Sequence, residues 1–337
     1  MAPPPQRQIP APNWLAHRYD PGHDAFQFHQ VSRDKRRQVA FLTDELLAPL
    51  DPPVALRRQD VTGAPGAKLS FVFHSAYCCS TLIANAYDRP GRAFSLKEPV
   101  VLNDIVGWRH RGGPAAQVSA VLGDAMEVSA RPFEAGERGV IKPSNVVNGL
   151  ATALIAARPE AGVLLLHAPL ADYLASIADK GLWGRLWVRD LLAKQWVDGL
   201  VELGVSQQDV FLQSDLQVAA LGWLAQHALF AKIARQWPQR VRTLNSEVLL
   251  ADPLAALEQL DMVLGIDSSA PERDEVVRAV FSRDAKTGTQ FEAGARASRQ
   301  EARAAVHAEE LKMVMAWAER VADSAGVAMA LPNALID

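Results

Sequence analysis

The chain has 337 residues, of which 49% are hydrophobic and 22% are charged, and its formal net charge is −3 at pH 7. This balance is typical of an ordinary globular protein and excludes a disordered or fibrous chain. A net charge so close to zero creates no global positive field. We therefore expect no nucleic-acid partner and no anionic membrane surface, and any bound anion must be held by a local site.

The two cysteines, Cys78 and Cys79, are adjacent. Neighbouring cysteines rarely bridge each other, and two ligands do not complete a structural zinc site, so we expect neither a disulfide nor a metal. Prolines stand near the N-terminus where a signal peptide needs an apolar segment, and no stretch reaches about 18 uninterrupted apolar residues. These features predict a reduced, cytoplasmic protein. The sequence carries no pattern that indicates an oligomeric state.

The N-terminal part, residues 1–65, is predicted to form an arm and a helix that pack on the core. A proline-rich arm leads to an expected helix over Asp34–Leu50, which the following Asp-Pro-Pro sequence ends. Residues 66–337 are expected to form a single α/β domain.

Short β-prone runs and helix-length stretches alternate from residue 69 onward. The β-prone runs are Leu69–Phe73, Ala93–Leu96, Gly139–Ile141, Gly162–Leu166 and Arg240–Leu244. The helical stretches are Pro99–Trp108, Asn145–Ala157, Leu170–Leu192, Leu216–Trp237 and, at the end, Ser298–Ala325. This alternation predicts a three-layer α/β/α arrangement, with a parallel sheet covered by helices on both faces. Ligands of such sheets bind beyond the carboxyl ends of the strands.

The first strand of this sheet leads into a helix through a loop of small and hydroxylated residues. A helix start offers unpaired backbone N–H groups and a partial positive charge, and hydroxyls of its first turn add further donors. We therefore predict a phosphate-binding loop. Its expected members are Ser75, Tyr77, Cys78, Cys79, Ser80 and Thr81. The alternative interpretation is that Ser80 or Thr81 only caps the helix.

This loop is not a Walker A motif, because G-x-x-x-x-G-K-[ST] is absent from the chain. In addition, His167 follows the strand at 162–166, where a magnesium-binding aspartate could stand. Phosphoryl transfer from a nucleoside triphosphate requires both lysine and metal. A P-loop-like kinase is therefore the least favoured of the alternatives.

Three segments together resemble the sulfotransferase superfamily that uses 3′-phosphoadenylyl sulfate: Phe71–Leu82, Phe94–Pro99 and Leu164–Ser176. The resemblance covers roughly residues 69–190 and, more loosely, 240–296. It implies a P-loop-like fold, a metal-free reaction and 3′-phosphoadenylyl sulfate as co-substrate. By the same resemblance, Ser80 and Thr81 bind the 5′-phosphosulfate end of the donor.

The resemblance also assigns the rest of the site. Ser176, with an arginine, binds the 3′-phosphate of the donor, and Glu98 is the catalytic base. His74 and His110 remain alternatives for the base, since histidine performs this role in other branches of the family. The sequence departs from the family at two positions: Tyr77 stands where a lysine or arginine is usual, and His167 stands where the 3′-phosphate segment normally begins with arginine.

Other cations are candidates for the missing positive charge. They are Lys97, Lys142, Arg185, Arg189 and Lys286, the last in a segment that resembles the family's nucleotide-covering loop. Structural interpretations stay open beside the functional ones. In these structural interpretations, Glu98 forms an ion pair with Lys97, Lys142 contacts Asn145 at a helix cap, and Arg185 pairs with Asp190. Ser176 could bond back to its own helical turn, and the spacing of Trp183 and Trp187 is typical of core residues.

The sequence thus predicts sulfuryl transfer from 3′-phosphoadenylyl sulfate to a hydroxyl or amine. Glu98, Lys142 and Lys97 are the expected catalytic residues, and the nucleotide and an acceptor are the expected partners. A second interpretation, motivated by Tyr77, is a non-catalytic nucleotide-binding protein of the same fold. No segment of the chain identifies the acceptor.

Overall fold

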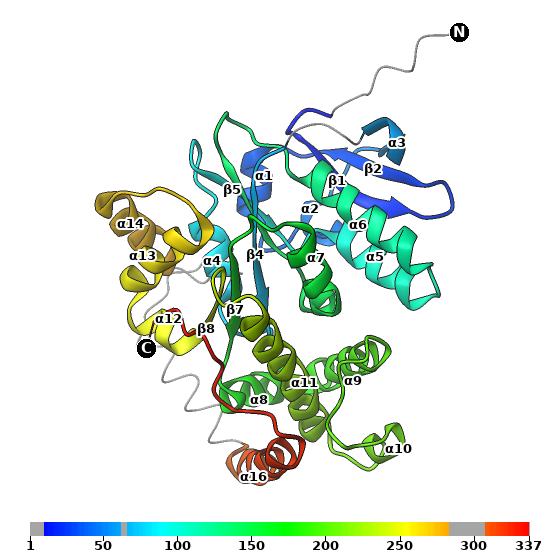
Figure 1. Cartoon of the computed structure of the whole chain (residues 1–337), viewed down its shortest axis with the longest axis vertical. Coiled ribbons are helices and arrows are strands. Elements are labelled where there is room, and N and C mark those ends of the chain that lie inside the picture. Colours follow the sequence, from blue (N-terminus) through cyan, green and yellow to red (C-terminus); the bar gives the residue numbers. More distant parts are fainter. Residues whose placement is uncertain (1–9, 62–65, 283–306, 337) are drawn as a thin grey trace.

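A computed structural model describes residues 10–61, 66–282 and 307–336 (Figure 1). Lys286 and the first part of the expected helix Ser298–Ala325 lie outside these residues. Within them, no helix is both long enough and apolar enough to cross a lipid bilayer.

The centre of the molecule is a five-stranded, fully parallel sheet. Its strands are β4 (Leu69–His74), β5 (Ala93–Lys97), β6 (Arg138–Lys142), β7 (Val163–His167) and β8 (Val241–Asn245). Their spatial order is β5-β6-β4-β7-β8, with parallel pairing between all neighbours. The sequence prediction of a parallel sheet built from these runs is confirmed, and no strand boundary shifts by more than one residue.

The strand order places a topological switch point beside β4. The chain passes from β4 to the edge strand β5, returns to β6 at one side of β4, and then continues to β7 at the other side. The chain connections thus run to opposite sides of β4. In open parallel sheets, ligands bind at such a point, beyond the carboxyl ends of the strands. The segments that follow β4, β5, β6 and β7 therefore form the expected ligand-binding edge.

The helices cover both faces of the sheet. The bounds are α4 (Ser80–Ala86), α5 (Val100–His110), α6 (Ala115–Ser129), the 3₁₀ turn η1 (Asn145–Leu150), α7 (Ala151–Ala157), α8 (Leu170–Asp179), α9 (Gly181–Val197), α10 (Gln207–Val210), α11 (Asp215–Gln236), α12 (Ser246–Ala251), α13 (Pro253–Leu264), α14 (Ala270–Val276), the π turn η2 (Val277–Phe281) and α16 (Ala308–Ala325). The single helix expected over Leu170–Leu192 is two helices, because Gly181, the first residue of α9, adopts a left-handed φ of 57°.

Two hydrophobic cores lie on the two faces of the sheet. In β7, Leu164 and Leu166 pack in the core that contains α4, α8 and α13. Val163 and Leu165, which point the other way, pack in the core that contains α5, α6 and α7. Because successive side chains of a strand point to opposite faces, a strand buried on both sides is apolar throughout. This accounts for the continuous apolar run of β7 and gives the three-layer arrangement.

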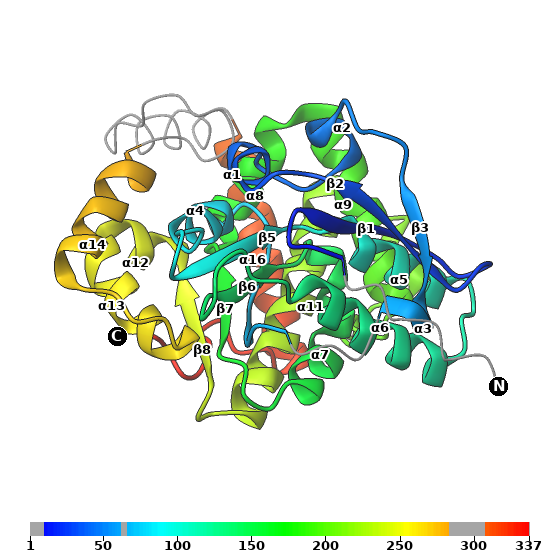
Figure 2. The same cartoon turned by 90° about the horizontal axis from the view of Figure 1, so that it is seen from above.

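The N-terminal region contains a second, antiparallel sheet that the sequence analysis missed. It consists of β1 (Trp14–Asp20), β2 (Ala25–Gln30) and β3 (Val54–Arg57), in that order. Arg18 of β1 holds this sheet on α5, because its Nε and Nη2 both donate to the carboxylate of Asp104 at 2.8 Å. Viewed from above, the small sheet lies beside α5 and α6 (Figure 2).

The prediction of one helix over Asp34–Leu50 is wrong. Two short helices, α1 (Arg33–Gln38) and α2 (Asp44–Leu47), replace it. Between them, Leu42 is fully buried and its backbone N–H donates to the carbonyl oxygen of Lys97 at 2.7 Å. This contact with the end of β5 holds the intervening segment out of a helix, so tertiary packing overrides the local helical pattern.

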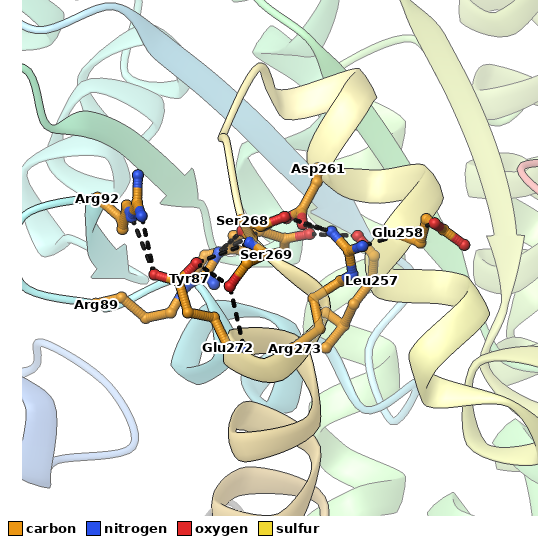
Figure 3. A network of polar contacts seen from close by, with 10 residues as sticks. All are labelled: Tyr87, Arg89, Arg92, Leu257, Glu258, Asp261, Ser268, Ser269, Glu272 and Arg273. Atoms are coloured by element: carbon orange, nitrogen blue, oxygen red, sulfur yellow. Dashed lines mark hydrogen bonds and ion pairs between the residues drawn. The ribbon is translucent and has the colours of Figure 1, made fainter.

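A polar network fastens α13 and α14 to the connection between α4 and β5 (Figure 3). Arg89 donates to Ser268 Oγ at 2.8 Å and lies 3.6 Å from Asp261 Oδ1. Arg273 donates to Asp261 Oδ2 at 3.1 Å and to the carbonyl oxygen of Ser268 at 2.7 Å. Because β5 begins just after Arg89, this network lies at the amino end of that strand, away from the carboxyl edge. We assign it a structural role.

Candidate functional site

Left-handed backbone conformations are concentrated in two loops at the carboxyl edge of the sheet. Six non-glycine residues of the described chain have a positive φ, and four of them are Ala76 (70°), Tyr77 (53°), Cys79 (63°) and Glu98 (53°). For a residue with a Cβ this conformation costs about 1–2 kcal/mol. Such strain is most often found at functional sites, where the surrounding structure maintains it. The loop after β4 thus bends sharply without the glycines of the familiar phosphate-binding motifs.

Part of the loop after β4 is held by the chain's own contacts. The backbone N–H of Ser75 donates to Leu166 O at 3.1 Å, and its Oγ accepts a hydrogen bond from the N–H of Ala168 at 3.2 Å. Cys78 is fully buried, and burial raises the pKa of its thiol to about 12. The Ser75 hydroxyl and the Cys78 thiol both anchor the loop to β7 and the core. The predicted contribution of these two residues to a donor site stays a prediction.

Ser80 and Thr81 are better placed to bind a ligand. They occupy the first two positions of α4, and the N-cap residue is Cys79, without a side-chain capping bond. Both residues are buried, and neither hydroxyl has a hydrogen-bond partner in the described part of the chain. The interpretation that one of them caps the helix is wrong. Neither oxygen is among the fully buried unpaired atoms, so both hydroxyls keep some exposure and are available to donate to a ligand at the start of the helix.

An ion pair between Lys142 and Glu98 lies beside this loop, at the ends of β6 and β5. Lys142 Nζ donates to Glu98 Oε1 and also lies 4.8 Å from the centre of the Phe41 ring. Lys142 is buried, whereas the Glu98 side chain keeps 19% of its surface exposed. The interpretations that Glu98 pairs with Lys97, or Lys142 with Asn145, are therefore wrong. Glu98 Oε2 has no partner among the described residues.

His74, the last residue of β4, contacts the same carboxylate. Its Nε2 lies 3.7 Å from Glu98 Oε1 and 3.0 Å from the carbonyl oxygen of Pro143. Its Nδ1 accepts a hydrogen bond from the N–H of Ala76 at 3.1 Å, so the hydrogen-bond pattern assigns the proton to Nε2. With both ring nitrogens engaged in this way, His74 orients the loop and Glu98 rather than acting as the base.

Lys97 does not belong to this cluster. It is fully buried, and its Nζ donates to the carbonyl oxygen of Arg37 at 3.0 Å and to Asn85 Oδ1 at 3.1 Å. Burial lowers the pKa of its ammonium to about 8, which the nearby carboxylate of Asp88 partly offsets. The expected catalytic role of Lys97 is therefore corrected to a structural one: it joins the end of β5 to α4 and to the N-terminal segment.

Three buried amides extend the polar cluster, and the sequence analysis overlooked their roles. Asn148 Nδ2 donates to His74 O at 3.0 Å and to Gln226 Oε1 at 2.9 Å. Asn148 Oδ1 and Asn145 Nδ2 are buried without a hydrogen-bond partner. The sequence contained a signal for this, because both asparagines belong to the turn η1 that comes after β6, at the edge where ligands of a parallel sheet bind. Unsatisfied buried amides beside an ion pair are a further sign of a missing ligand.

His167 ends β7 on the other side of β4. Its ring lies 5.3 Å from that of His227, and His227 stacks on Trp223 at 4.1 Å. Burial lowers the pKa of His167 to about 4 and that of His227 to about 3. His167 is therefore neutral at pH 7. It supplies no positive charge in place of the family's arginine, but its Nδ1 is buried without a hydrogen-bond partner. A contact of His167 with the nucleotide therefore stays a prediction.

The remaining candidates lie on the helices. Ser176 is partly exposed on α8, and its hydroxyl makes no bond back to its turn within the described residues. Arg185 of α9 lies 3.7 Å from Asp215 and 3.6 Å from Glu310, not beside Asp190. Arg189, also on α9, donates to Asp215 at 2.6 Å. His110, at the end of α5, donates to Asp198 at 2.7 Å. His110 stays an alternative prediction for the base, since a bond from one ring nitrogen to a carboxylate leaves the other nitrogen able to take a proton.

Comparison with known proteins adds no family assignment. No family model matches the chain, and a search of the curated proteins finds no match. Among the residues that the structure describes, no three His, Cys, Asp or Glu side chains are grouped so that they could hold a metal ion. A function is therefore inferred from the geometry of the chain's own residues.

Proposed function

We propose that this protein transfers a sulfuryl group from 3′-phosphoadenylyl sulfate to a hydroxyl or amine acceptor. The observation that carries the proposal is the ion pair of Lys142 and Glu98 next to the loop whose Ser80 and Thr81 hydroxyls lack partners. These groups follow three adjacent strands at the switch point of the sheet, where ligands bind. A P-loop-like assignment of the fold is part of this proposal.

The residues at this edge fit an anionic donor. The hydroxyls of Ser80 and Thr81, the ammonium of Lys142 and the unpartnered Nδ2 of Asn145 are all hydrogen-bond donors. Bonds from such groups to an anion are stronger than bonds between neutral groups. We assign the first two residues to the 5′ end of the donor, and Ser176 remains the proposed contact of its 3′-phosphate.

When bound, the donor supplies an activated sulfuryl group. The acceptor oxygen or nitrogen forms a bond to sulfur while the bond from sulfur to the phosphate oxygen breaks. Glu98 takes the proton of the acceptor on Oε2, its carboxylate oxygen without a described partner, and Lys142 offers positive charge to the departing oxygen. General-base assistance of this kind contributes about 10²–10⁴-fold in rate. The preorganised charges contribute further by stabilising the transition state.

A second candidate function is nucleotide binding without group transfer. It is favoured by the pairing of the other candidate cations: Lys97 is turned toward Asn85, and Arg185 faces two carboxylates. Tyr77 occupies the loop position at which the resemblance expects a basic residue. Tight binding of adenosine 3′,5′-bisphosphate, with no turnover on any hydroxyl or amine acceptor, would identify this second function.

The loop hydroxyls provide the binding test. We expect Thr81→Val to weaken binding of adenosine 3′,5′-bisphosphate by about 10- to 100-fold, because a hydrogen bond to a charged group contributes about 1.5–3 kcal/mol. The measurement is isothermal titration calorimetry in excess chelator. Thr152→Val is the matched control, since Thr152 is also the second residue of its helix, α7, but is exposed. Failure of the unaltered protein to bind the bisphosphate at millimolar concentration would end the proposal.

A further inference from the structure

The pairing of β4 with β6 ends before β4 does. It stops at Phe71, although β4 continues to His74. On the other side, the backbone N–H of Ser75 donates to the carbonyl oxygen of Leu166 in β7. Because the C=O and N–H of a trans peptide point in opposite directions, the carbonyl oxygen of His74 faces the side of β6, where the strand pairing has already ended.

Side chains replace the strand pairing at this point. His74 Nε2 donates to the carbonyl oxygen of Pro143 at 3.0 Å, and Asn148 Nδ2 donates to the carbonyl oxygen of His74 at 3.0 Å. Both side chains are buried. These two bonds hold the end of β4 against the segment that follows β6. They leave the ring of His74 with its Nε2 at 3.7 Å from Glu98 Oε1.

The amide of Asn148 is held in turn by Gln226 of α11. Gln226 Nε2 donates to the carbonyl oxygen of Gly222 at 3.2 Å, and its Oε1 accepts from Asn148 Nδ2 at 2.9 Å. A backbone carbonyl only accepts, so Gly222 requires the nitrogen of Gln226 on its side. The oxygen of Gln226 then faces Asn148 and requires a nitrogen there, which is the nitrogen that also reaches His74. One orientation of both amides therefore satisfies every bond from α11 to β4.

Packing alone does not account for the two amides. Gln226 is fully buried on a helix whose other buried residues are mostly apolar, and Asn148 is almost as buried. Burying an amide is unfavourable unless it is hydrogen-bonded, and Asn148 Oδ1 has no partner among the described residues. Buried polar networks, by contrast, fix one arrangement of the groups that they join. The group that this network joins to α11 is His74.

A further buried amide, on α9, provides an internal comparison. Gln195 Nε2 also donates to the carbonyl oxygen of Gly222 at 3.2 Å, but no bond joins Gln195 to Asn148 in the described part of the chain. Gln195 is buried, whereas Trp183 of the same helix is 61% exposed, so the interpretation of Trp183 as a core residue is wrong. Gln195 and Gln226 thus share a buried setting and an acceptor, and they differ in the link to the site.

We infer that Asn148 is a positioning residue that fixes the ring of His74 and, through it, the carboxylate of Glu98. Gln226 holds Asn148 in place. The link to His74 stands by itself, whereas the benefit to Glu98 as a base rests on the proposed function. The bond from Asn148 fixes the peptide that ends β4, so the ring stays between a backbone N–H at its Nδ1 and a backbone carbonyl at its Nε2. In that place only the Nε2–H tautomer satisfies both ring nitrogens.

The tautomer of His74 tests this link without any turnover. Nitrogen NMR on protein with isotope-labelled histidine is recorded at about pH 8, where exposed histidines are neutral, and His74→Gln identifies the signals. We expect a predominant Nε2–H tautomer in the unaltered protein. Gln226→Met keeps the side-chain length but cannot bind Asn148. It should lower the ratio of Nε2–H to Nδ1–H by about twofold to tenfold, as expected for loss of one buried hydrogen bond. The matched control, Gln195→Met, should leave the ratio unchanged.

A second variant covers the case in which Gln226→Met does not fold. Asn148→Leu removes the same link from its other end and should change the tautomer ratio in the same direction. Equal effects of Gln226→Met and Gln195→Met, or no effect of either, would mean that the amides only pack, and would overturn the inference. A His74 proton on Nδ1 in the unaltered protein would overturn it as well. So would loss of the fold in both Gln226→Met and Asn148→Leu, which would assign these residues a purely structural role.

Calorimetry with adenosine 3′,5′-bisphosphate separates this inference from the proposed function. Gln226→Met should keep its affinity within about twofold, since Gln226 is fully buried behind Asn148. On any acceptor that is turned over, kcat should fall by about twofold to tenfold at an unchanged KM for the donor. Weaker bisphosphate binding by Gln226→Met would assign the amides to the nucleotide and overturn the inference. If the unaltered protein does not bind the bisphosphate, the proposed function fails, and the tautomer of His74 still decides the link.

Discussion

Replacing Glu98 by glutamine is expected to lower turnover by about 10²–10⁴-fold, because the amide cannot accept the proton of the acceptor. Glutamine preserves the shape of the side chain, and its amide oxygen can still accept the hydrogen bond from Lys142. Affinity for adenosine 3′,5′-bisphosphate should therefore change little. The measurements are release of the bisphosphate from the labelled donor over a panel of hydroxyl and amine acceptors, and calorimetry with the bisphosphate alone.

The control for this variant separates chemistry from stability. Asp104→Asn removes a partly buried carboxylate that accepts two bonds from Arg18, at the contact between α5 and the small sheet. Both variants disturb an ion pair and should lower the free energy of unfolding, but only Glu98→Gln should lose turnover. Equal turnover in Glu98→Gln and the unaltered protein would remove Glu98 as the base. A parallel loss in both variants would attribute the effect to stability.

The parallel sheet could be predicted because its strands are buried on both faces. A strand such as β7 must be apolar at every position, and its continuous run of Val and Leu is visible in the sequence. The small antiparallel sheet could also have been predicted. Aromatic residues in β1 and β2 flank a short connection with Pro21 and Gly22, and this combination is a hairpin signal.

The partners of the two buried lysines could not be predicted. Lys97 and Lys142 are register partners on adjacent strands, and both directly precede the loops of the site. Which of them meets Glu98 depends on the left-handed turn at Glu98, whose N–H donates to the carbonyl oxygen of Lys142 at 2.7 Å. It also depends on Asn85, from the end of α4, which captures Lys97. Such contacts are set by tertiary packing, and neither residue spacing nor charge pattern encodes them.

Acidification is expected to destabilise the fold through the buried pair of His167 and His227. Burial lowers the pKa of these residues to about 4 and about 3, whereas an unfolded histidine titrates near 6.5. Between these pH values, each of the two histidines is protonated in the unfolded chain but stays neutral in the folded chain. Stability from the neutral rings is therefore complete above about pH 6.5 and is lost as the pH falls, by about 1.4 kcal/mol per pH unit for each histidine.

The variant His227→Phe isolates this contribution. Phenylalanine keeps a flat ring against Trp223 but does not titrate, although the carbonyl oxygen of Met329 loses its donor. Urea unfolding at pH 7, 6 and 5 should show a lower free energy of unfolding for the variant at pH 7 and a shallower decline toward pH 5, by about 1.4 kcal/mol per unit below pH 6. Parallel slopes in both proteins would mean that His227 binds its proton equally in the folded and unfolded chains, and would contradict the prediction.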